Sequence, residues 1–229
     1  MNRIAKSTIA ALGLLAAAGA TPAAAVTISN PTNTHDLGYL SGSLIGGNQT
    51  QFLGQTFTAP VTGELTNFQF TLNSSSLQSL YGVVFAWDGS APTTELWRSP
   101  TIAGTAGLVS FNPTGVTLTA GQTYVAFLST YELEGNSGLA SIGTCLTFVG
   151  CTSNLTPNLG TLIIGNIYSD VPVFSPIVNN SRDATFSVTI AEAAVPEPAT
   201  WAMMIIGFGA VGFSVRRRQG NTAQARAAQ

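Results

Sequence analysis

Short runs in which apolar and polar residues alternate occupy the middle of the chain. In residues 65–72, Phe68, Phe70 and Leu72 share one face of an extended strand and polar residues occupy the other. Residues 184–190 repeat the pattern, and residues 80–87 are apolar on both faces, which predicts a central strand. Further strands are expected at 52–58, 95–98, 108–111, 116–118, 123–129, 146–149 and 161–168.

Gly- and Pro-containing turns separate these runs, and no interior segment has a helical period. Many short strands joined by such turns are typical of an all-β protein. We therefore predict an antiparallel β-sandwich, jelly-roll-like, over residues 26–194. The turn 88–92 is a strong signal, and Asp88 is interpreted as its turn residue, with calcium ligation as the alternative.

The first 25 residues have the composition of a secretory signal peptide. A positive start precedes an apolar stretch at 9–20, and Ala23 to Ala25 provide a small-residue cleavage site. We predict cleavage after Ala25 by the Sec export route. The stretch is too short for a membrane-spanning helix, although an uncleaved anchor is the alternative.

A second uncharged run, residues 199–215, follows Pro196-Glu197-Pro198 and precedes Arg216, Arg217 and Arg218. Its 17 residues are at the short end of the range for a transmembrane helix. The arginines would act as a basic stop-transfer cluster that stays cytoplasmic, leaving residues 219–229 as a disordered cytoplasmic tail. The alternative is a helix buried in a soluble core, but this run has no polar face. A dinucleotide-binding reading of Gly207 to Gly212 is rejected because no strand precedes it.

The tail resembles the PEP-CTERM sorting signal in its Pro-Glu-Pro-x-x-Trp-Ala variant. Pro196, Glu197, Pro198, Trp201 and Ala202 match the motif, and the arginine cluster matches its basic end. The resemblance covers residues 195–218. It implies a Gram-negative bacterium, recognition by a membrane-embedded exosortase, transient anchoring in the inner membrane, and a link to exopolysaccharide and biofilm.

Charge is sparse in the body and mostly negative. Residues 26–194 contain nine acidic and two basic side chains, a net charge of about −7, whereas the whole chain has a net charge of −2. Such a body is repelled by phosphate backbones, so we expect no nucleic-acid partner.

Cys145 and Cys151 are the two cysteines of the chain. In an oxidising compartment we expect them to form a disulfide that closes a small loop. A metal site, which would lack further Cys or His partners, and a free reactive pair are the alternatives.

The body offers little catalytic chemistry. It contains one histidine, His35, and neither a nucleophile elbow nor a zinc motif. Glu132 and Glu134 would share a face if the strand after Tyr131 continued, which would suit calcium binding or acid–base chemistry. A solvated strand end explains the same pair. No cofactor and no metal are expected.

Three aromatic residues, Tyr81, Trp87 and Trp97, have the chemistry to stack on sugar rings. Trp97 is the best candidate because it stands beside Arg98 between turns; the alternative is core packing. The segments 54–57, 87–92 and 118–124 also look like bacterial surface sandwiches related to carbohydrate-binding modules.

Together these features predict an exported, exosortase-sorted protein of the cell surface or extracellular matrix. Its body would be non-catalytic, with a structural or polysaccharide-associated role. The competing hypotheses are a polysaccharide lyase or hydrolase on a jelly roll, and a spacer that binds no ligand.

Overall fold

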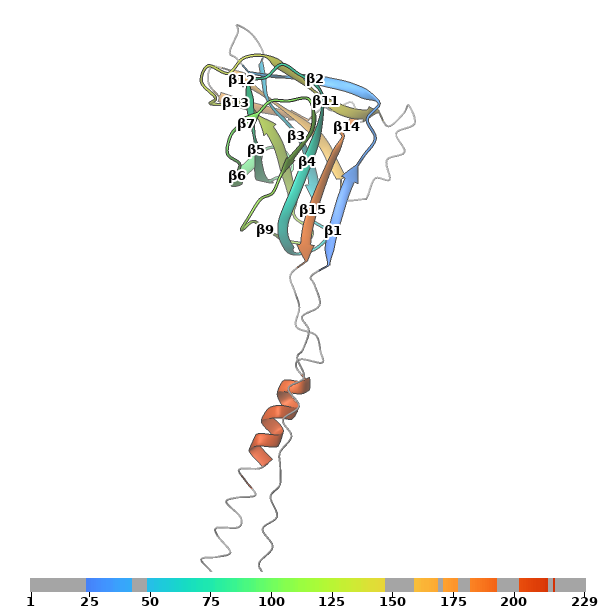
Figure 1. Cartoon of the computed structure of the whole chain (residues 1–229), viewed down its shortest axis with the longest axis vertical. Coiled ribbons are helices and arrows are strands. Elements are labelled where there is room, and N and C mark those ends of the chain that lie inside the picture. The colour runs from blue at the N-terminus through green and yellow to red at the C-terminus, as the bar shows by residue number, and fades with distance from the viewer. Residues whose placement is uncertain are drawn as a thin grey trace, which may run out of the picture. The chain divides into compact units, whose positions relative to one another are not determined.

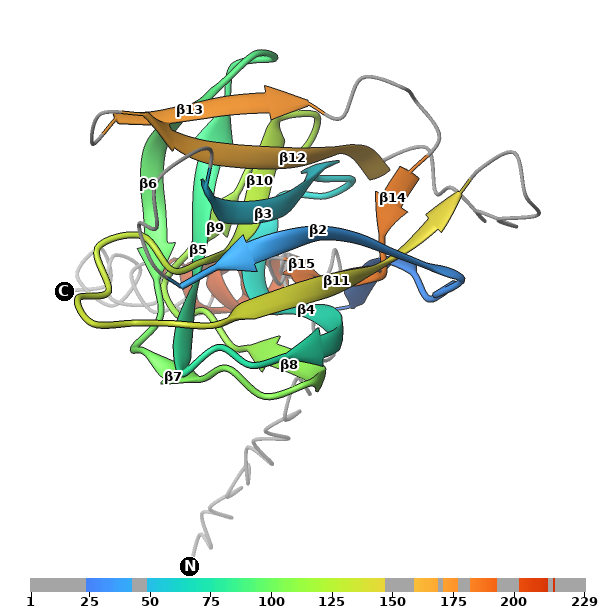
Figure 2. The ribbon, with the colours of Figure 1, turned by 90° about the horizontal axis from the view of Figure 1, so that it is seen from above.

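The computed structural model describes residues 24–42, 49–146, 159–168, 171–176, 182–192, 202–213 and 216. Ala23–Ala193 form one compact unit, and the helix at 202–213 belongs to another. The compact unit consists of two curled sheets in which every strand pairing is antiparallel (Figures 1 and 2). The expectation of an antiparallel all-β body is thereby confirmed.

The first sheet has eight strands. Its main path runs β1–β15–β4–β11–β14, while β2 pairs with β11, and β8 and β9 pair with β4. The strands are β1 (Ala25–Asn30), β2 (His35–Ser41), β4 (Gly63–Ser75), β8 (Gly107–Phe111), β9 (Thr117–Leu118), β11 (Leu139–Leu146), β14 (Arg182–Ala184) and β15 (Phe186–Glu192).

The second sheet has seven strands in the order β13–β12–β3–β10–β5–β6, with β7 paired to β5. The strands are β3 (Gln49–Thr58), β5 (Ser79–Trp87), β6 (Pro92–Arg98), β7 (Ile102–Ala103), β10 (Thr123–Ser129), β12 (Leu159–Tyr168) and β13 (Val171–Pro176). The run at 80–87, apolar on both faces, lies between β10 and β6, away from the sheet edges, as expected.

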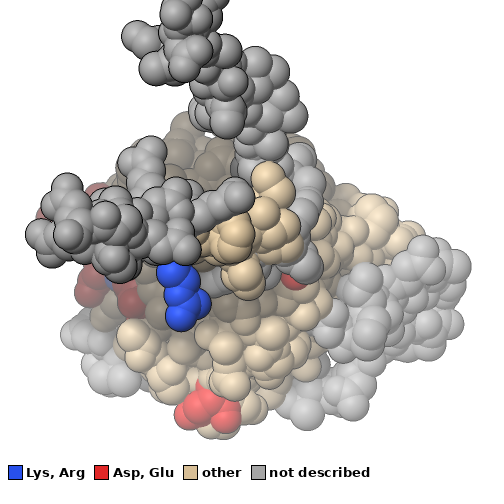
Figure 3. All heavy atoms as spheres, turned by 90° about the horizontal axis from the view of Figure 1, so that it is seen from below, with Lys and Arg blue, Asp and Glu red and all other residues tan. Residues whose placement is uncertain are grey.

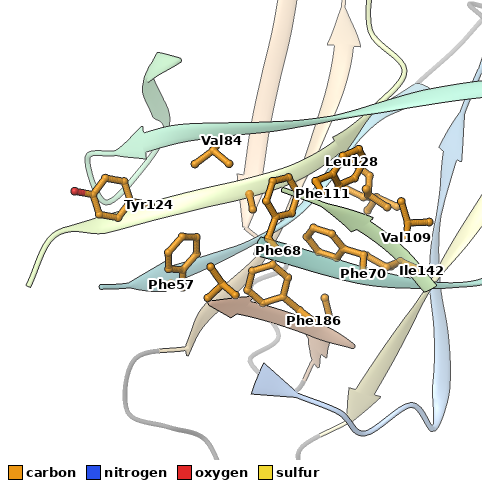
Figure 4. Packing of buried hydrophobic residues seen from close by; sticks show 14 of the residues in the cluster. Phe57, Phe68, Phe70, Val84, Val109, Phe111, Tyr124, Leu128, Ile142 and Phe186 are labelled. Atoms are coloured by element: carbon orange, nitrogen blue, oxygen red, sulfur yellow. The ribbon is translucent and has the colours of Figure 1, made fainter. Parts of the chain in front are cut away.

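The main core fills the space between the two sheets (Figure 4). Phe68, Phe70 and Phe186 enter it from the first sheet, and Phe57 and Leu128 enter it from the second. The alternation predicted for β4 is therefore confirmed. A bulge in the β4–β15 pairing, next to Thr189, lets Leu65 also face the core although it is out of step with Phe68.

Candidate functional site

The structure describes only part of the C-terminal signal. Ala202 begins the helix at 202–213, whose side chains are all exposed, and Arg216 is also exposed. Among the described residues, no helix has the length and apolar character needed to cross a membrane, so the predicted span 199–215 is not supported. Pro196, Glu197, Pro198, Trp201, Arg217 and Arg218 lie outside the described residues.

The predicted signal-cleavage site coincides with the start of the fold. Ala25 is the first residue of β1 and pairs with Ala191 of β15. The Ala24 carbonyl accepts a hydrogen bond from the Glu192 N–H at 2.8 Å. Cleavage after Ala25 would remove that one bond and leave the β1–β15 ladder from Val26 onward; Ala23 lies outside the described residues.

The outer face of the first sheet is polar over β15, β4 and β8, and the exposed charged residues of these strands, Glu64 and Glu192, lie at the end where β4 begins and β15 ends. Asn67 donates hydrogen bonds to Ser110 Oγ at 2.9 Å, to the Phe111 carbonyl at 3.1 Å and to Asn112 Oδ1 at 3.0 Å. Gln69 accepts from the Ser187 hydroxyl at 3.3 Å. Side-chain amides and hydroxyls thus form a connected network, which we call the polar face.

A hollow of about 240 Å³ lies on the polar face, and none of its described lining residues is ionisable. The lining residues are Ser29, Asn30, Pro31, Gln69, Thr71, Leu108, Thr185, Phe186 and Ser187. Leu108 stands at the hollow with 66% of its surface exposed. Hydroxyls and amides beside an apolar side chain are groups that suit neutral, hydroxyl-rich ligands.

The outer face of the second sheet is apolar, and we call it the aromatic face. Phe127 of β10 is completely buried there. Its ring centroid lies 5.6 Å from that of Phe52 and 5.4 Å from that of Phe174. Gly54 makes room for the Phe127 ring, because a Cβ at that position would lie 2.3 Å from Phe127 Cδ1.

Arg98 lies at the edge of the aromatic face. Its guanidinium pairs with Glu95 at 2.7 Å and Glu132 at 3.5 Å, and lies 4.8 Å from the centroid of the Tyr81 ring. Hydrogen bonding to Glu95 raises the pKa of Arg98, so its charge is permanent. Burial raises the pKa of Tyr81, and the nearby Ser129 hydroxyl opposes that shift. Despite this proximity, the Tyr81 hydroxyl has no well-formed hydrogen bond within the described chain.

The loop from Thr130 to Gly138 borders the aromatic face and a cavity of about 470 Å³. Tyr131 and Leu133 pack onto the apolar cluster that contains Phe52. Glu132 adopts a left-handed backbone conformation with φ of 60°, which is rare for residues other than glycine. β10 ends at Ser129, so the strand does not continue to Glu134 as the shared-face reading required.

The structure brings the two carboxylates of the predicted pair to one cavity and places the histidine away from them. Glu132 and Glu134 both line the cavity. His35 begins β2, whereas Ser41 ends it beside Thr130, about 20 Å away along the strand. Within the part of the chain described, no three His, Cys, Asp or Glu residues cluster in a way that could hold a metal ion.

Trp97 contributes to the core rather than to a flat exposed platform. It is half-buried, and its ring meets those of Phe68 and Phe111 edge-to-face at centroid distances of 5.9 Å and 6.3 Å. This is the core-packing alternative considered above, and it disfavours Trp97 as a sugar-stacking residue. Trp87 packs against the aromatic face.

Two further sequence predictions concern local chemistry. Asp88 is a turn residue as interpreted, since its Oδ1 accepts backbone N–H bonds from Ser90 and Ala91, both at 2.7 Å, and these bonds lower its pKa. Cys145 is buried in β11 and is not a free thiol. Cys151 lies outside the described residues, so the Cys145–Cys151 disulfide stays a prediction.

Sequence reasoning missed two cavity residues, Gln51 and Asn136. Both are buried polar residues with an exposed fraction of 5%. Neither residue belongs to a sequence motif. Each lines the cavity only because the fold brings distant segments together there. An amide residue just before an apolar run, as Gln51 stands before Phe52, is too common a pattern to indicate a site.

Comparison with known proteins gave one match. No curated protein and no solved structure matched the chain. Residues 194–218 match the family model of the PEP-CTERM protein-sorting motif. The chain therefore carries a PEP-CTERM sorting signal, as expected of an exported protein sorted by an exosortase.

Proposed function

We propose that this protein is a non-catalytic component of a Gram-negative cell surface or extracellular matrix, and that its body associates with polysaccharide. The body, a β-sandwich of jelly-roll-like type, is the cargo. The proposed route is Sec export, removal of residues 1–25, transient anchoring in the inner membrane, and exosortase processing near Pro196-Glu197-Pro198.

The observation that carries this proposal is the position of the sorting signal relative to the fold. β15 ends at Glu192, and the matched motif begins at residue 194. Because β15 pairs with β4 inside the first sheet, the body's fold is completed just before the signal starts. The body is therefore the unit that sorting delivers.

The polar face supports the polysaccharide part of the proposal. Its exposed amides and hydroxyls match the hydrogen-bonding chemistry of sugar hydroxyls without requiring charge. The view in Figure 3 shows a described surface on which few charged residues are visible. Such a surface can lie against a hydrated polymer with little desolvation of charge.

Sorting is tested by expressing the full-length chain in a Gram-negative host with and without its exosortase. We expect a shorter form at the cell surface or in the medium only when the exosortase is present. Replacing Pro196, Glu197 and Pro198 together by alanine should leave a full-length membrane-associated form. The matched control is Arg226→Ala, outside residues 194–218. Identical processing in all four cases would refute the sorting route.

Polysaccharide association is tested by co-sedimenting the full-length protein with exopolysaccharide from its own host. Saturable binding without a change in polymer chain length is the expected result. Shortening of the polymer would support the enzyme hypothesis instead. Absence of both binding and shortening would leave a spacer with no ligand.

A further inference from the structure

The larger cavity lies at the end of the body where β2 ends, β3 begins and β10 ends. Its volume of about 470 Å³ is in the range of small-molecule sites in proteins. The described lining comes from the loop at 130–137 and from three other positions: Gly42 after β2, Gln51 in β3 and Ile167 in β12. Residues from β3, from β12, from the end of β2 and from the loop after β10 therefore build one hollow.

Gln51 provides an unpaired polar group in this hollow. Its backbone carbonyl accepts hydrogen bonds from the Thr130 N–H and the Ser129 hydroxyl, both at 3.0 Å. The residue as a whole is 95% buried, and its side-chain amide makes no hydrogen bond to any described residue. Because this amide is not among the fully buried atoms without a partner in the described chain, it is open to the cavity, where a ligand can take the place of water as its partner. An amide offers both donors and an acceptor, the combination that sugar hydroxyls require.

The loop that forms the cavity wall is held in place before any ligand arrives. Asn136 donates to the Ser79 carbonyl at 2.8 Å and accepts from the Ser79 N–H at 3.1 Å. The Thr130 hydroxyl donates to the Ser41 carbonyl. These contacts tie the loop to β5 and β2, so little ordering entropy has to be lost on binding.

The described cavity lining has no cationic side chain and two carboxylates. Arg98 lies 3.5 Å from Glu132 and partly compensates its charge. Glu134 forms no ion pair with the described part of the chain. A negative charge therefore remains at the cavity, favouring a positively charged ligand group and disfavouring uronic acids.

We propose that this cavity binds a sugar residue with a free amino group, as in a polysaccharide that contains unacetylated hexosamine. Glu134 accepts the ammonium group, and the Gln51 amide pairs with neighbouring hydroxyls. The proposal rests on the polysaccharide association proposed above and adds to the polar face a second contact site, the cavity, which selects the class of sugar.

The test uses the full-length protein and two defined probes, the tetramer of glucosamine and its fully N-acetylated counterpart, in calorimetric titrations at neutral pH. We expect the glucosamine tetramer to bind and the N-acetylated tetramer to bind at least about tenfold more weakly, since only the first provides a charge-assisted hydrogen bond. Raising the salt concentration should weaken binding of the glucosamine tetramer.

The variant Glu134→Gln keeps the shape of the exposed side chain and removes its charge. We expect it to lose about tenfold in affinity for the glucosamine tetramer and to lose the preference over the acetylated probe. Gln51→Leu should weaken binding of both tetramers, with folding checked by circular dichroism. Glu192→Gln is the matched control, because Glu192 is far from the cavity. It pairs with Gly63 at the start of β4, whereas the cavity is nearer Ser75 at the end of that strand, about 40 Å away.

Equal affinity for the two tetramers, or unchanged binding in Glu134→Gln, would overturn the proposed site. If the protein still co-sedimented with exopolysaccharide in that case, the polysaccharide association would stand and only the cavity assignment would fail. Loss of co-sedimentation for the unaltered protein would instead refute the proposed function itself.

Discussion

The outer faces of the two sheets differ in their surroundings, because one is polar and the other is apolar and covered by other segments of the chain. In the first sheet, outward positions such as Asn67 and Gln69 are polar and partly exposed, and both donate hydrogen bonds to the Ser110 hydroxyl. In the second sheet, outward positions such as Val83 and Phe127 are apolar and completely buried. A strand that is apolar on both faces must be covered on both, and here the Thr130–Gly138 loop and Phe174 of β13 contribute that cover.

The two faces also differ in what they contribute to the protein, stability in one case and access for a ligand in the other. The aromatic face contributes free energy of folding and leaves a cavity where its covering loop begins. The polar face buries little and keeps its groups available to a ligand.

The largest effect should follow loss of a ring from the aromatic face. Phe127→Ala removes a fully buried side chain that contacts Phe52, Phe85 and Phe174. We expect the free energy of unfolding to fall by about 3–5 kcal/mol, measured by urea denaturation. Leu108→Ala on the polar face is the control and should change it by less than about 0.5 kcal/mol. Similar losses for the two variants would contradict the distinction.

A smaller effect should follow from adding one carbon. In Gly54→Ala, the new Cβ would lie 2.3 Å from both the Ala126 carbonyl oxygen and Phe127 Cδ1. Because one of these atoms is backbone, the sheet has to shift, and we expect a loss of about 1–3 kcal/mol in thermal and urea unfolding. Unchanged midpoints of thermal and urea unfolding would mean that the aromatic face has room for an added methyl group at residue 54.

The polar pair between the sheets should respond to pH. Asp183 of β14 is buried, and burial raises its pKa, although Gln55 of β3 donates to Asp183 Oδ1 at 3.3 Å. The folded state therefore holds the proton more tightly than the unfolded chain. The resulting stability is present below the unfolded pKa of about 3.9 and is lost as pH rises through the folded value.

The variant Asp183→Asn tests this pH dependence. Asparagine has no carboxyl group to ionise, so the variant should lack the loss of stability that Asp183 causes as the pH rises. At neutral pH it should be more stable than the parent. Urea denaturation between pH 3.5 and pH 7 measures both. The expectation fails if the two proteins have parallel pH profiles.

The smallest effect is expected on the polar face. Asn67→Ala removes three hydrogen bonds, but the groups left behind are largely in contact with water, which can replace the amide. We expect a loss of about 0.5–1 kcal/mol in the free energy of unfolding. A loss as large as that of Phe127→Ala would mean that the polar network is itself a structural core.

Several strands were predictable because their pattern is local. β4, β5, β10 and β15 have clear alternation or continuous apolar runs, and each was expected within a few residues of its observed bounds. β11 was not expected, because the predicted strand 146–149 overlaps it only at Leu146. Its sequence mixes glycine, serine and threonine with apolar residues, so its extended structure depends on pairing with β2, β4 and β14.

The strands β1, β13 and β14 were also not predictable from a local sequence pattern. β1 starts at the predicted cleavage site, where composition indicates a targeting segment rather than a strand. β14 has three residues and is too short to carry a period. Their partners in β15, β12 and β11 determine their conformation.

The sequence by itself determined the antiparallel β class, several of the core strands and the sorting signal, because each is written in a short contiguous pattern. Only the tertiary structure decided which outer face is covered and where a cavity forms. Gln51 and Asn136 reach that cavity from segments 85 residues apart in the sequence, and a shift of one residue in strand register would turn Gln51 to the other face of its sheet. Sites of this kind are set by register and loop anchoring, which depend on the whole fold.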